Sequence, residues 1–376
     1  MSTSAILNDI CDRNNVPCTV FASQNLAFCS KEDAELLGRV CGVNSVRCCL
    51  SEIVYSSYGC EDKDAVSHAR ELGETFAGEL HQFVEESIAP GTVLFSHTVN
   101  APMLWGYSLW LERLKKEPPR IVVNHISLPD DAADLEAHRL ALEAASRHDA
   151  LTIMGGSIPL CRLLEQYTGK HVGYMPTPMA TSLPPRRREK DDTPVFCVAG
   201  EARCGKNFEI LPRGIGRYLV GGGAGKFSIQ LHRRDDSLDE VIGLLQALQE
   251  KFPLRIELNL QPFYGQEYYN HISRCDAILL PYPVWNYRTR PTFIIFEAAA
   301  LGVSSIVQRG TSMEEELRSL NNGSVFMDGD SPAELTRAME AFERNLEANR
   351  RAASDAAPVC RAAHNPQRYF SLIMGE

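Results

Sequence analysis

Short apolar runs alternate with longer amphipathic segments along most of this chain. The runs end at Gly, Pro or polar residues, which is typical of buried parallel strands. In the segment 62–88, by contrast, apolar residues recur at helical spacing: Ala65, Ala69, Leu72, Phe76, Leu80 and Phe83. Repeated strand–helix units predict an α/β protein with parallel sheets.

The expected strands fall into two groups, each interleaved with helices. The first group has strands at 18–21, 93–95, 121–124 and 151–154, and helices at 5–13, 31–40, 62–88, 103–114, 131–147 and 159–167. The second has strands at 195–198, 227–231, 256–260, 277–280, 305–307 and 324–327, and helices at 208–219, 237–250, 266–274, 292–301, 312–320 and 332–347. Two α/β domains are therefore expected.

The clearest boundary between the two groups lies at 176–194. Five prolines and a charge run make this stretch unsuited to a buried element. We expect an N-terminal Rossmann-like domain at 1–178, a linker at 179–194 and a C-terminal Rossmann-like domain at 195–376. The last helices can pack back on the N-terminal domain. The arginines at 186–188 are expected to be solvated linker charges.

Composition and charge narrow the class of protein. The 376 residues are 44% hydrophobic and 23% charged, with a net charge of −10, which argues against a nucleic-acid binder. No run of 18 apolar residues occurs, so no transmembrane segment is expected. The N-terminus lacks a signal-peptide pattern, and the 12 cysteines form no C-x-x-C pair. Reduced thiols in a cytoplasmic protein are therefore expected.

A loop rich in charge and aromatic residues follows the expected strand 277–280. Arg288 and Arg290 lie in this loop, and Pro291 and Thr292 open the next helix, where Thr can act as the cap. Ligands of open α/β sheets bind at the carboxyl ends of strands, and helix starts attract anions. Two guanidinium groups added there predict a diphosphate site.

This stretch resembles the donor-sugar motif of GT-B glycosyltransferases, of the large retaining family that includes many bacterial sugar transferases. The matching residues are Asp276, Leu280, Pro281, Tyr282, Tyr287, Arg288, Arg290, Glu297, Ala298 and Gly302. The resemblance implies two Rossmann-like domains facing a cleft, a nucleotide-diphosphate sugar as substrate and no cofactor. It gives Glu297 a contact with the donor's ribose. Many members carry another acid eight residues earlier, where this chain has Thr289.

Two further cations follow the first strand of the second half. The resemblance implies that Arg203 and Lys206 hold the donor's phosphates, and the alternative is two solvated charges at a turn. The glycine-rich stretch 220–227 is not a P-loop. Val220 replaces the first required Gly, Phe227 replaces Ser or Thr, and the stretch precedes a strand, so we expect a flexible turn.

His97 and His125 each follow a strand of the N-terminal domain. The resemblance places a histidine near the sugar at the second of these positions, where it can bond a hydroxyl or the developing charge. The alternative is a buried histidine satisfied by backbone. For the acids at 129–131 and 328–330 we expect helix capping rather than metal binding.

These observations predict a metal-independent transferase that moves a sugar from a nucleotide-diphosphate sugar to a glycan, lipid-linked or small-molecule acceptor. Peripheral membrane contact is compatible with such an acceptor. The family's first strand is not evident before the helix expected at 5–13. One alternative is a degenerate GT-B protein that binds nucleotide sugar or a partner without transfer. Another is a nucleotide-sugar epimerase or hydrolase.

Overall fold

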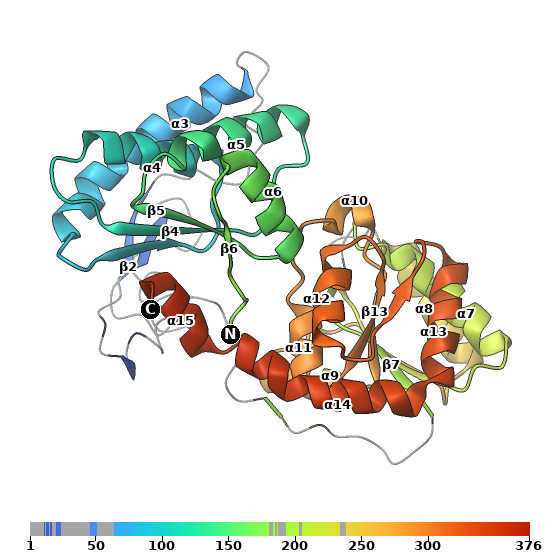
Figure 1. Cartoon of the computed structure of the whole chain (residues 1–376). Helices are drawn as coiled ribbons and strands as arrows, with labels where there is room; N and C mark the ends of the chain where they lie inside the picture. Colours follow the sequence, from blue (N-terminus) through green and yellow to red (C-terminus); the bar gives the residue numbers. More distant parts are fainter. Residues whose placement is uncertain are drawn as a thin grey trace. The chain divides into compact units, whose positions relative to one another are not determined.

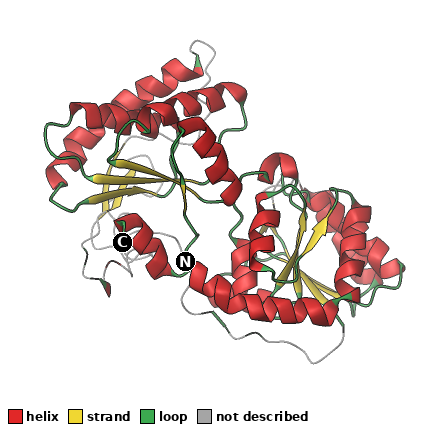
Figure 2. Cartoon of the chain, in the orientation of Figure 1, coloured by secondary structure: helices red, strands yellow, loops and turns green. Residues whose placement is uncertain are grey.

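The computed structural model describes residues 11, 13–14, 16, 20–23, 46–50, 64–179, 183–184, 186, 193–202, 205–233 and 238–376 (Figures 1 and 2). The chain divides into two units. Unit 1 comprises Met1–Pro178 and Pro366–Glu376, and unit 2 comprises Met179–Asn365. The helix expected at 31–40, and most of the one at 5–13, lie outside the described residues.

Unit 1 is built on a parallel four-stranded sheet. Its order is β3 (Val93–Ser96), β4 (Arg120–His125), β5 (Leu151–Gly155) and β6 (Gly173–Tyr174). A separate parallel pair joins β1 (Val20–Ser23) to β2 (Val46–Leu50). The strands expected at 93–95, 121–124 and 151–154 are confirmed. The chain before the helix expected at 5–13, where the resemblance would put a further strand, lies outside the described residues.

Helices cover both faces of this sheet (Figure 1). Successive side chains of β4 point to opposite faces of the sheet. Ile121 and Val123 pack in the apolar cluster on one face, whereas Val122 packs with Tyr369 and Ile373 of the last helix on the other. The helices are α3 (Ala65–Glu79), continued by a π turn (Leu80–Val84) and a 3-10 turn (Glu85–Ser87), then α4 (Ala101–Arg113), α5 (Ala132–Ala145), α6 (Ile158–Thr168) and α15 (Pro366–Met374).

Unit 2 is built on a parallel six-stranded sheet. Its order is β11 (Ile256–Asn259), β9 (Lys226–Gln230), β7 (Val195–Val198), β12 (Ala277–Leu280), β13 (Ser304–Gln308) and β14 (Val325–Met327). This is the doubly wound Rossmann order, in which the direction of winding reverses between the first strand, β7, and the fourth, β12. Ligands of such sheets bind at the carboxyl ends of the strands at that switch point.

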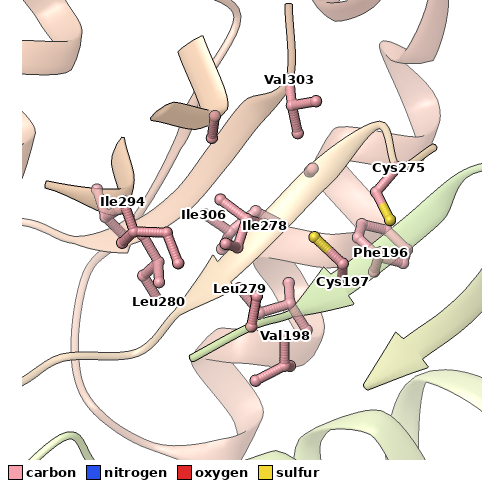
Figure 3. Close-up of a cluster of buried hydrophobic side chains, with 14 of the residues drawn as sticks. Phe196, Cys197, Val198, Cys275, Ile278, Leu279, Leu280, Ile294, Val303 and Ile306 are labelled. Atoms are coloured by element: carbon pink, nitrogen blue, oxygen red, sulfur yellow. The ribbon is translucent and has the colours of Figure 1, made fainter. Parts of the chain in front are cut away.

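Apolar side chains of β7, β12 and β13 form the centre of this core (Figure 3). The helices α7 (Leu211–Val220), α8 (Asp239–Lys251) and α13 (Pro332–Arg344) lie on one face. The helices α9 (Gly265–Ser273), α11 (Ile294–Ala300), α12 (Ser312–Leu320) and α14 (Leu346–Ala363) lie on the other. Short elements complete the unit: β8 (Glu201–Ala202) paired with β10 (His232–Arg233), η3 (Phe208–Ile210) and α10 (Val284–Tyr287).

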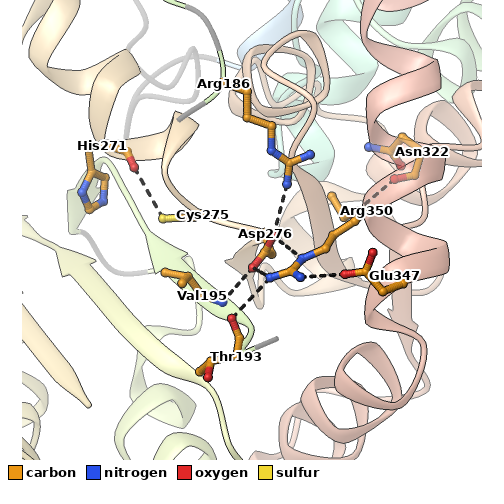
Figure 4. Close-up of polar contacts among 10 residues, drawn as sticks. Arg186, Thr193, Val195, His271, Cys275, Asp276, Asn322, Glu347 and Arg350 are labelled. Carbon is orange, nitrogen blue, oxygen red and sulfur yellow. Dashed lines mark hydrogen bonds and ion pairs between the residues drawn. The ribbon is translucent and has the colours of Figure 1, made fainter. Parts of the chain in front are cut away.

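The expectation of solvated charges at 186–188 is wrong for Arg186, whose side chain is only 18% exposed. Its guanidinium lies 3.2 Å from Asp276 Oδ1, at the amino end of β12 (Figure 4). Asp276 is buried and also accepts hydrogen bonds from Arg350 and from the Val195 N–H. A buried carboxylate requires such partners, and this requirement brings the arginine out of solvent.

The glycine-rich stretch forms a turn between α7 and β9, as expected, but specific bonds hold it. The guanidinium of Arg255 donates to the carbonyls of Gly223 at 2.7 Å and of Gly225 at 2.9 Å. Glu343 accepts a hydrogen bond from the Ala224 N–H at 2.9 Å. The turn is therefore anchored to its own domain.

Candidate functional site

Two loops of unit 2 meet at the switch point of its sheet. One follows β7 and spans 199–207, and the other follows β12 and spans 281–293. The side-chain amide of Asn286 in the second loop donates to the Gly205 carbonyl in the first at 3.0 Å. Gly205 has φ +82°, and a Cβ there would lie 2.9 Å from Asn286 Nδ2. Glycine is therefore required for this approach.

Lys206 is buried in the first of these loops. Its ammonium donates to the Glu201 carbonyl at 2.7 Å and lies 5.4 Å from the ring centroid of Tyr282 and 5.8 Å from that of Phe208. Tyr282 in turn packs on Tyr287, with ring centroids 4.6 Å apart. The alternative of a solvated charge is thus wrong for Lys206. Arg203 lies outside the described residues.

Arg288 and Arg290 follow α10 in the second loop. Arg288 is exposed and Arg290 is half-buried. The backbone between them and α11 is held by Ser312, whose hydroxyl donates to the Arg290 carbonyl at 2.6 Å. The two arginines and Lys206 therefore come from the two loops that flank the switch point.

The expectation that Thr292 caps the next helix is wrong. The helix, α11, begins at Ile294, and its N-cap Phe293 makes no side-chain capping bond. Thr292 is buried, and its hydroxyl has no hydrogen-bond partner among the residues that the structure describes. The helix has only 7 residues, so its dipole is small and the charge of the site comes from side chains.

Glu297 points from α11 towards α9, where two tyrosines meet its carboxylate. The hydroxyl of Tyr268 donates to Oε2 at 2.9 Å, and that of Tyr269 donates to Oε1 at 3.2 Å. Burial raises the pKa of Glu297, and the two hydroxyls oppose this effect. Neither tyrosine was expected at the site, because nothing in the sequence of a short amphipathic helix shows which residue faces a carboxylate 29 positions away.

Tyr268 contacts the acid of this candidate site, and Tyr282 contacts its buried cation. The pKa of Tyr268 is raised well above its usual value. Burial is the largest cause, followed by the negative charge of Glu297 and then by Tyr282. The ring of Tyr282 lies beside the ammonium of Lys206. Lys206 follows β7 and Glu297 follows β12, so a cation and a carboxylate, each with aromatic neighbours, both come after strands of the switch point. Such a set of groups can bind an anionic ligand that also carries hydroxyl groups.

His125 is the last residue of β4 in unit 1, and its ring is fully buried. Its Nδ1 lies 3.3 Å from Nε2 of His138 in α5, so its partner is a side chain rather than backbone. Its Nε2 has no partner in the described part of the chain. Burial, and secondarily His138, hold the pKa of His125 well below its usual value, so the ring is neutral.

His97 follows β3, and its ring contacts α15, the last helix of the chain. Its Nδ1 lies 3.0 Å from the hydroxyl of Tyr369 in α15. Burial lowers the pKa of His97. Its carbonyl accepts a hydrogen bond at 3.2 Å from Asn124, the residue before His125, so the two strand ends are joined.

The expectation that acids cap the following helix is confirmed at 129–131 and wrong at 328–330, where a serine is the capping residue. Asp131 accepts hydrogen bonds from the N–H groups of Ala133 and Asp134 at the start of α5. Ser331 caps α13 after the acids at 328–330, and Asp328 pairs with Arg309 at 2.6 Å. Within the described ranges, no group of three or more His, Cys, Asp or Glu side chains is placed to hold a metal ion.

The cysteines that the structure describes in full are buried free thiols, as predicted: Cys11, Cys161, Cys197, Cys275 and Cys360. Burial raises the pKa of Cys360 to about 12, so this thiol is unreactive. None of the helices in the described part of the chain combines the length and the apolar character that crossing a membrane requires.

No protein-family profile and no curated protein sequence matches this chain. By structure it is similar to a glycosyltransferase from Rickettsia africae, with a TM-score of 0.65 and 9% identity over 99% of this chain and 93% of that one. It is also similar to the Anabaena protein HepE in complex with UDP, with a TM-score of 0.66 and 12% identity over 100% and 95% of the two chains.

A third similar structure is a sucrose-phosphate synthase from Thermosynechococcus elongatus, with a TM-score of 0.63 and 13% identity over 98% of this chain and 90% of that one. HepE has also been solved in complex with UDP-glucose. Together with the four-stranded and six-stranded parallel sheets, these similarities establish the fold. The prediction of two Rossmann-like domains in the GT-B fold is confirmed.

Proposed function

We propose that this protein is a glycosyltransferase that moves a sugar from a nucleoside-diphosphate sugar to a glycan, lipid-linked or small-molecule acceptor. One observation carries the proposal. A buried lysine, Lys206, lies at the Rossmann switch point, in a loop that Asn286 ties to the loop carrying Arg288 and Arg290. Folds of this kind bind nucleotides at that edge. The similarity to HepE, which was solved with UDP and with UDP-glucose, supports the same ligand class.

The cations would act on the leaving group. During transfer the bond from the sugar's anomeric carbon to the diphosphate oxygen breaks, the diphosphate leaves with the electron pair, and the acceptor hydroxyl bonds to carbon and loses its proton. Negative charge grows on the diphosphate as this happens. Lys206, Arg288 and Arg290, together with Arg203, supply the compensating charge, and we propose that no metal is needed.

Unit 1 would hold the acceptor, with His125 and His97 as its candidate residues. Both rings are desolvated, and that of His125 is neutral, so His125 would donate or accept a hydrogen bond rather than supply a charge. Because the ring of His125 is fully enclosed in the free protein, direct contact with a sugar requires a local rearrangement.

The residue at position 289 favours a second candidate function, binding of a nucleotide sugar without transfer. Thr289 stands where many proteins with this motif carry an acid, so the chain could bind a nucleotide sugar without transferring it. An epimerase or hydrolase would bind the same donor. These alternatives share the nucleotide site and differ in what happens to the sugar.

Two measurements separate these functions. In a thermal-shift screen with UDP, GDP, ADP and UDP-glucose, a ligand at a hundredfold its dissociation constant should stabilise the protein by about 2.7 kcal/mol. A nucleotide-binding chain is then incubated with donor and a panel of acceptors. Glycosylated product supports transfer, release of free sugar without an acceptor supports hydrolysis, and an altered nucleotide sugar supports epimerisation. Binding without any product supports the binding protein, and no shift with any nucleotide contradicts the proposal.

A further inference from the structure

Two consecutive tyrosines of α9 hold both oxygens of one carboxylate. Tyr268 donates to Oε2 of Glu297 and Tyr269 donates to Oε1. Successive residues of a helix point about 100° apart, so the two hydroxyls approach the carboxylate from different directions. Their rings meet edge to face, with centroids 5.4 Å apart. Within the described ranges, hydroxyl groups and no cation contact Glu297.

Placing the Glu297 carboxylate on a largely apolar helix costs free energy, which a purely structural role for this residue does not explain. Glu297 lies on a helix whose neighbouring residues Ile295, Phe296 and Ala298 are buried apolar side chains. Burial there disfavours the charged carboxylate. Two hydroxyl donors favour the ionised form instead, and a pair of charge-assisted hydrogen bonds also fixes its orientation. The tyrosines thus keep a charge where the surrounding helix favours an apolar residue.

The carboxylate retains the capacity to bind a ligand. An ionised carboxylate has about four acceptor positions, and the tyrosines occupy two of them. One position on each oxygen therefore remains for a hydroxyl donor. The family resemblance implies that Glu297 contacts the donor's ribose, whose two neighbouring hydroxyls would occupy these two positions.

We propose that Tyr268 and Tyr269 are positioning residues that orient Glu297 towards a ribose diol, and that they make the site select ribonucleotides over 2′-deoxyribonucleotides. This inference rests on the proposed function, because it requires a nucleotide in unit 2. Glu297 lies in α11, directly after the loop that carries Arg288 and Arg290, which places the tyrosine pair next to the proposed phosphate site. The same nucleotide would thus be held at its phosphates and at its sugar.

The test compares UDP with 2′-deoxy-UDP by calorimetry on the parent, Tyr268→Phe and Tyr269→Phe. Each substitution keeps the ring and removes one hydroxyl. We expect UDP binding to weaken about tenfold in each variant, the lower range for a charge-assisted hydrogen bond, whereas 2′-deoxy-UDP binding changes little. The preference for ribose should therefore fall. Tyr264→Phe is the matched control, since Tyr264 is the exposed N-cap residue of the same helix.

A double-mutant cycle excludes a purely structural role. If the tyrosines act through Glu297, Tyr268→Phe should have almost no effect on UDP affinity in a Glu297→Gln background. Equal weakening of both nucleotides, an unchanged ribose preference, or full additivity with Glu297→Gln would overturn the inference while leaving nucleotide binding in place. A parent protein that binds none of UDP, GDP and ADP would instead overturn the proposed function and the inference with it.

Discussion

The guanidinium of Arg350 in α14 binds both oxygens of Asp276, at 2.8 Å and 2.9 Å, although both side chains are almost fully buried. The same arginine donates to the Thr193 carbonyl and pairs with Glu347 (Figure 4). One carboxylate at the amino end of β12 therefore fastens both α14 and the segment that leads into β7. The proposed nucleotide site lies at the opposite, carboxyl end of the same strand.

Loss of Asp276 should destabilise unit 2 strongly. Removing one partner of a buried ion pair leaves an uncompensated charge, so Asp276→Ala should lower the free energy of unfolding by about 3–5 kcal/mol in urea titrations. Asp328→Ala is the control, because its pair with Arg309 is exposed and should contribute at most about 1 kcal/mol. Equal effects of the two substitutions would show that the buried cluster has no special role.

Lys206→Ala and Arg288→Ala should each weaken nucleotide-diphosphate binding by about 1.5–3 kcal/mol, the usual range for charged hydrogen bonds. Only Lys206→Ala should also lower stability, because Lys206 is buried and bonded to the Glu201 carbonyl whereas Arg288 is exposed. Calorimetry with UDP and urea unfolding measure the two effects. Parent-like affinity in both variants would mean that the phosphate site lies elsewhere.

The sequence predicts the sheets far better than it predicts the site. The strands expected at 195–198 and 277–280 coincide with β7 and β12, because a short apolar run that ends at Gly or Pro leaves little alternative to a buried strand. Helix ends are less certain. Thr292 has the chemistry of a cap, yet the helix begins two residues later, since several starts within one turn differ little in energy.

Partners of polar side chains were not predictable at all. Tyr268 meets Glu297, His138 meets His125, and Arg186 meets Asp276 only because tertiary packing brings distant segments together. Charge and polarity in the sequence show that these residues need partners, but not which ones. The contact of His97 with Tyr369 spans 272 positions and follows from the return of α15 to unit 1.

Glu297→Gln should weaken nucleotide binding without lowering stability at neutral pH. Burial raises the pKa of Glu297 in the folded protein, so the unfolded chain ionises more readily. The parent should therefore lose stability, relative to the variant, as pH rises from the ordinary glutamate pKa of 4.5 through the raised pKa of the folded state. Melting temperatures of both proteins across this range measure the difference. A difference that grows towards acid would contradict the assigned direction.

The buried pair of His125 and His138 should make stability depend on pH in the opposite direction. Burial lowers the pKa of His138 to about 4, below its usual 6.5, so the unfolded chain takes up a proton that the folded chain rejects. The stability that this neutral ring provides is complete above pH 6.5 and is lost as pH falls from 6.5 towards 4. Between pH 7 and pH 5 the parent should lose about 1–2 kcal/mol more than His138→Gln in urea unfolding. An identical loss in both proteins would contradict the shift.

The last prediction concerns His125 in transfer. If its ring acts on the sugar as the glycosidic bond breaks, His125→Ala should lower the transfer rate on the order of a hundredfold or more and leave donor binding nearly unchanged. The reason is that His125 belongs to unit 1, whereas the proposed phosphate ligands belong to unit 2, so its contribution falls on the transition state rather than on the bound donor.

His97→Ala should lower the rate less, because the ring of His97 contacts Tyr369 and would act on the sugar only through its neighbours. His138→Gln is the matched control for packing, since it disturbs the same buried pair from the α5 side. A rate loss confined to His125→Ala assigns the chemistry to that ring. If the well-folded His125→Ala protein transfers sugar at the parent rate, or if His138→Gln reduces the rate equally, then the pair stabilises unit 1 and His125 takes no part in the reaction.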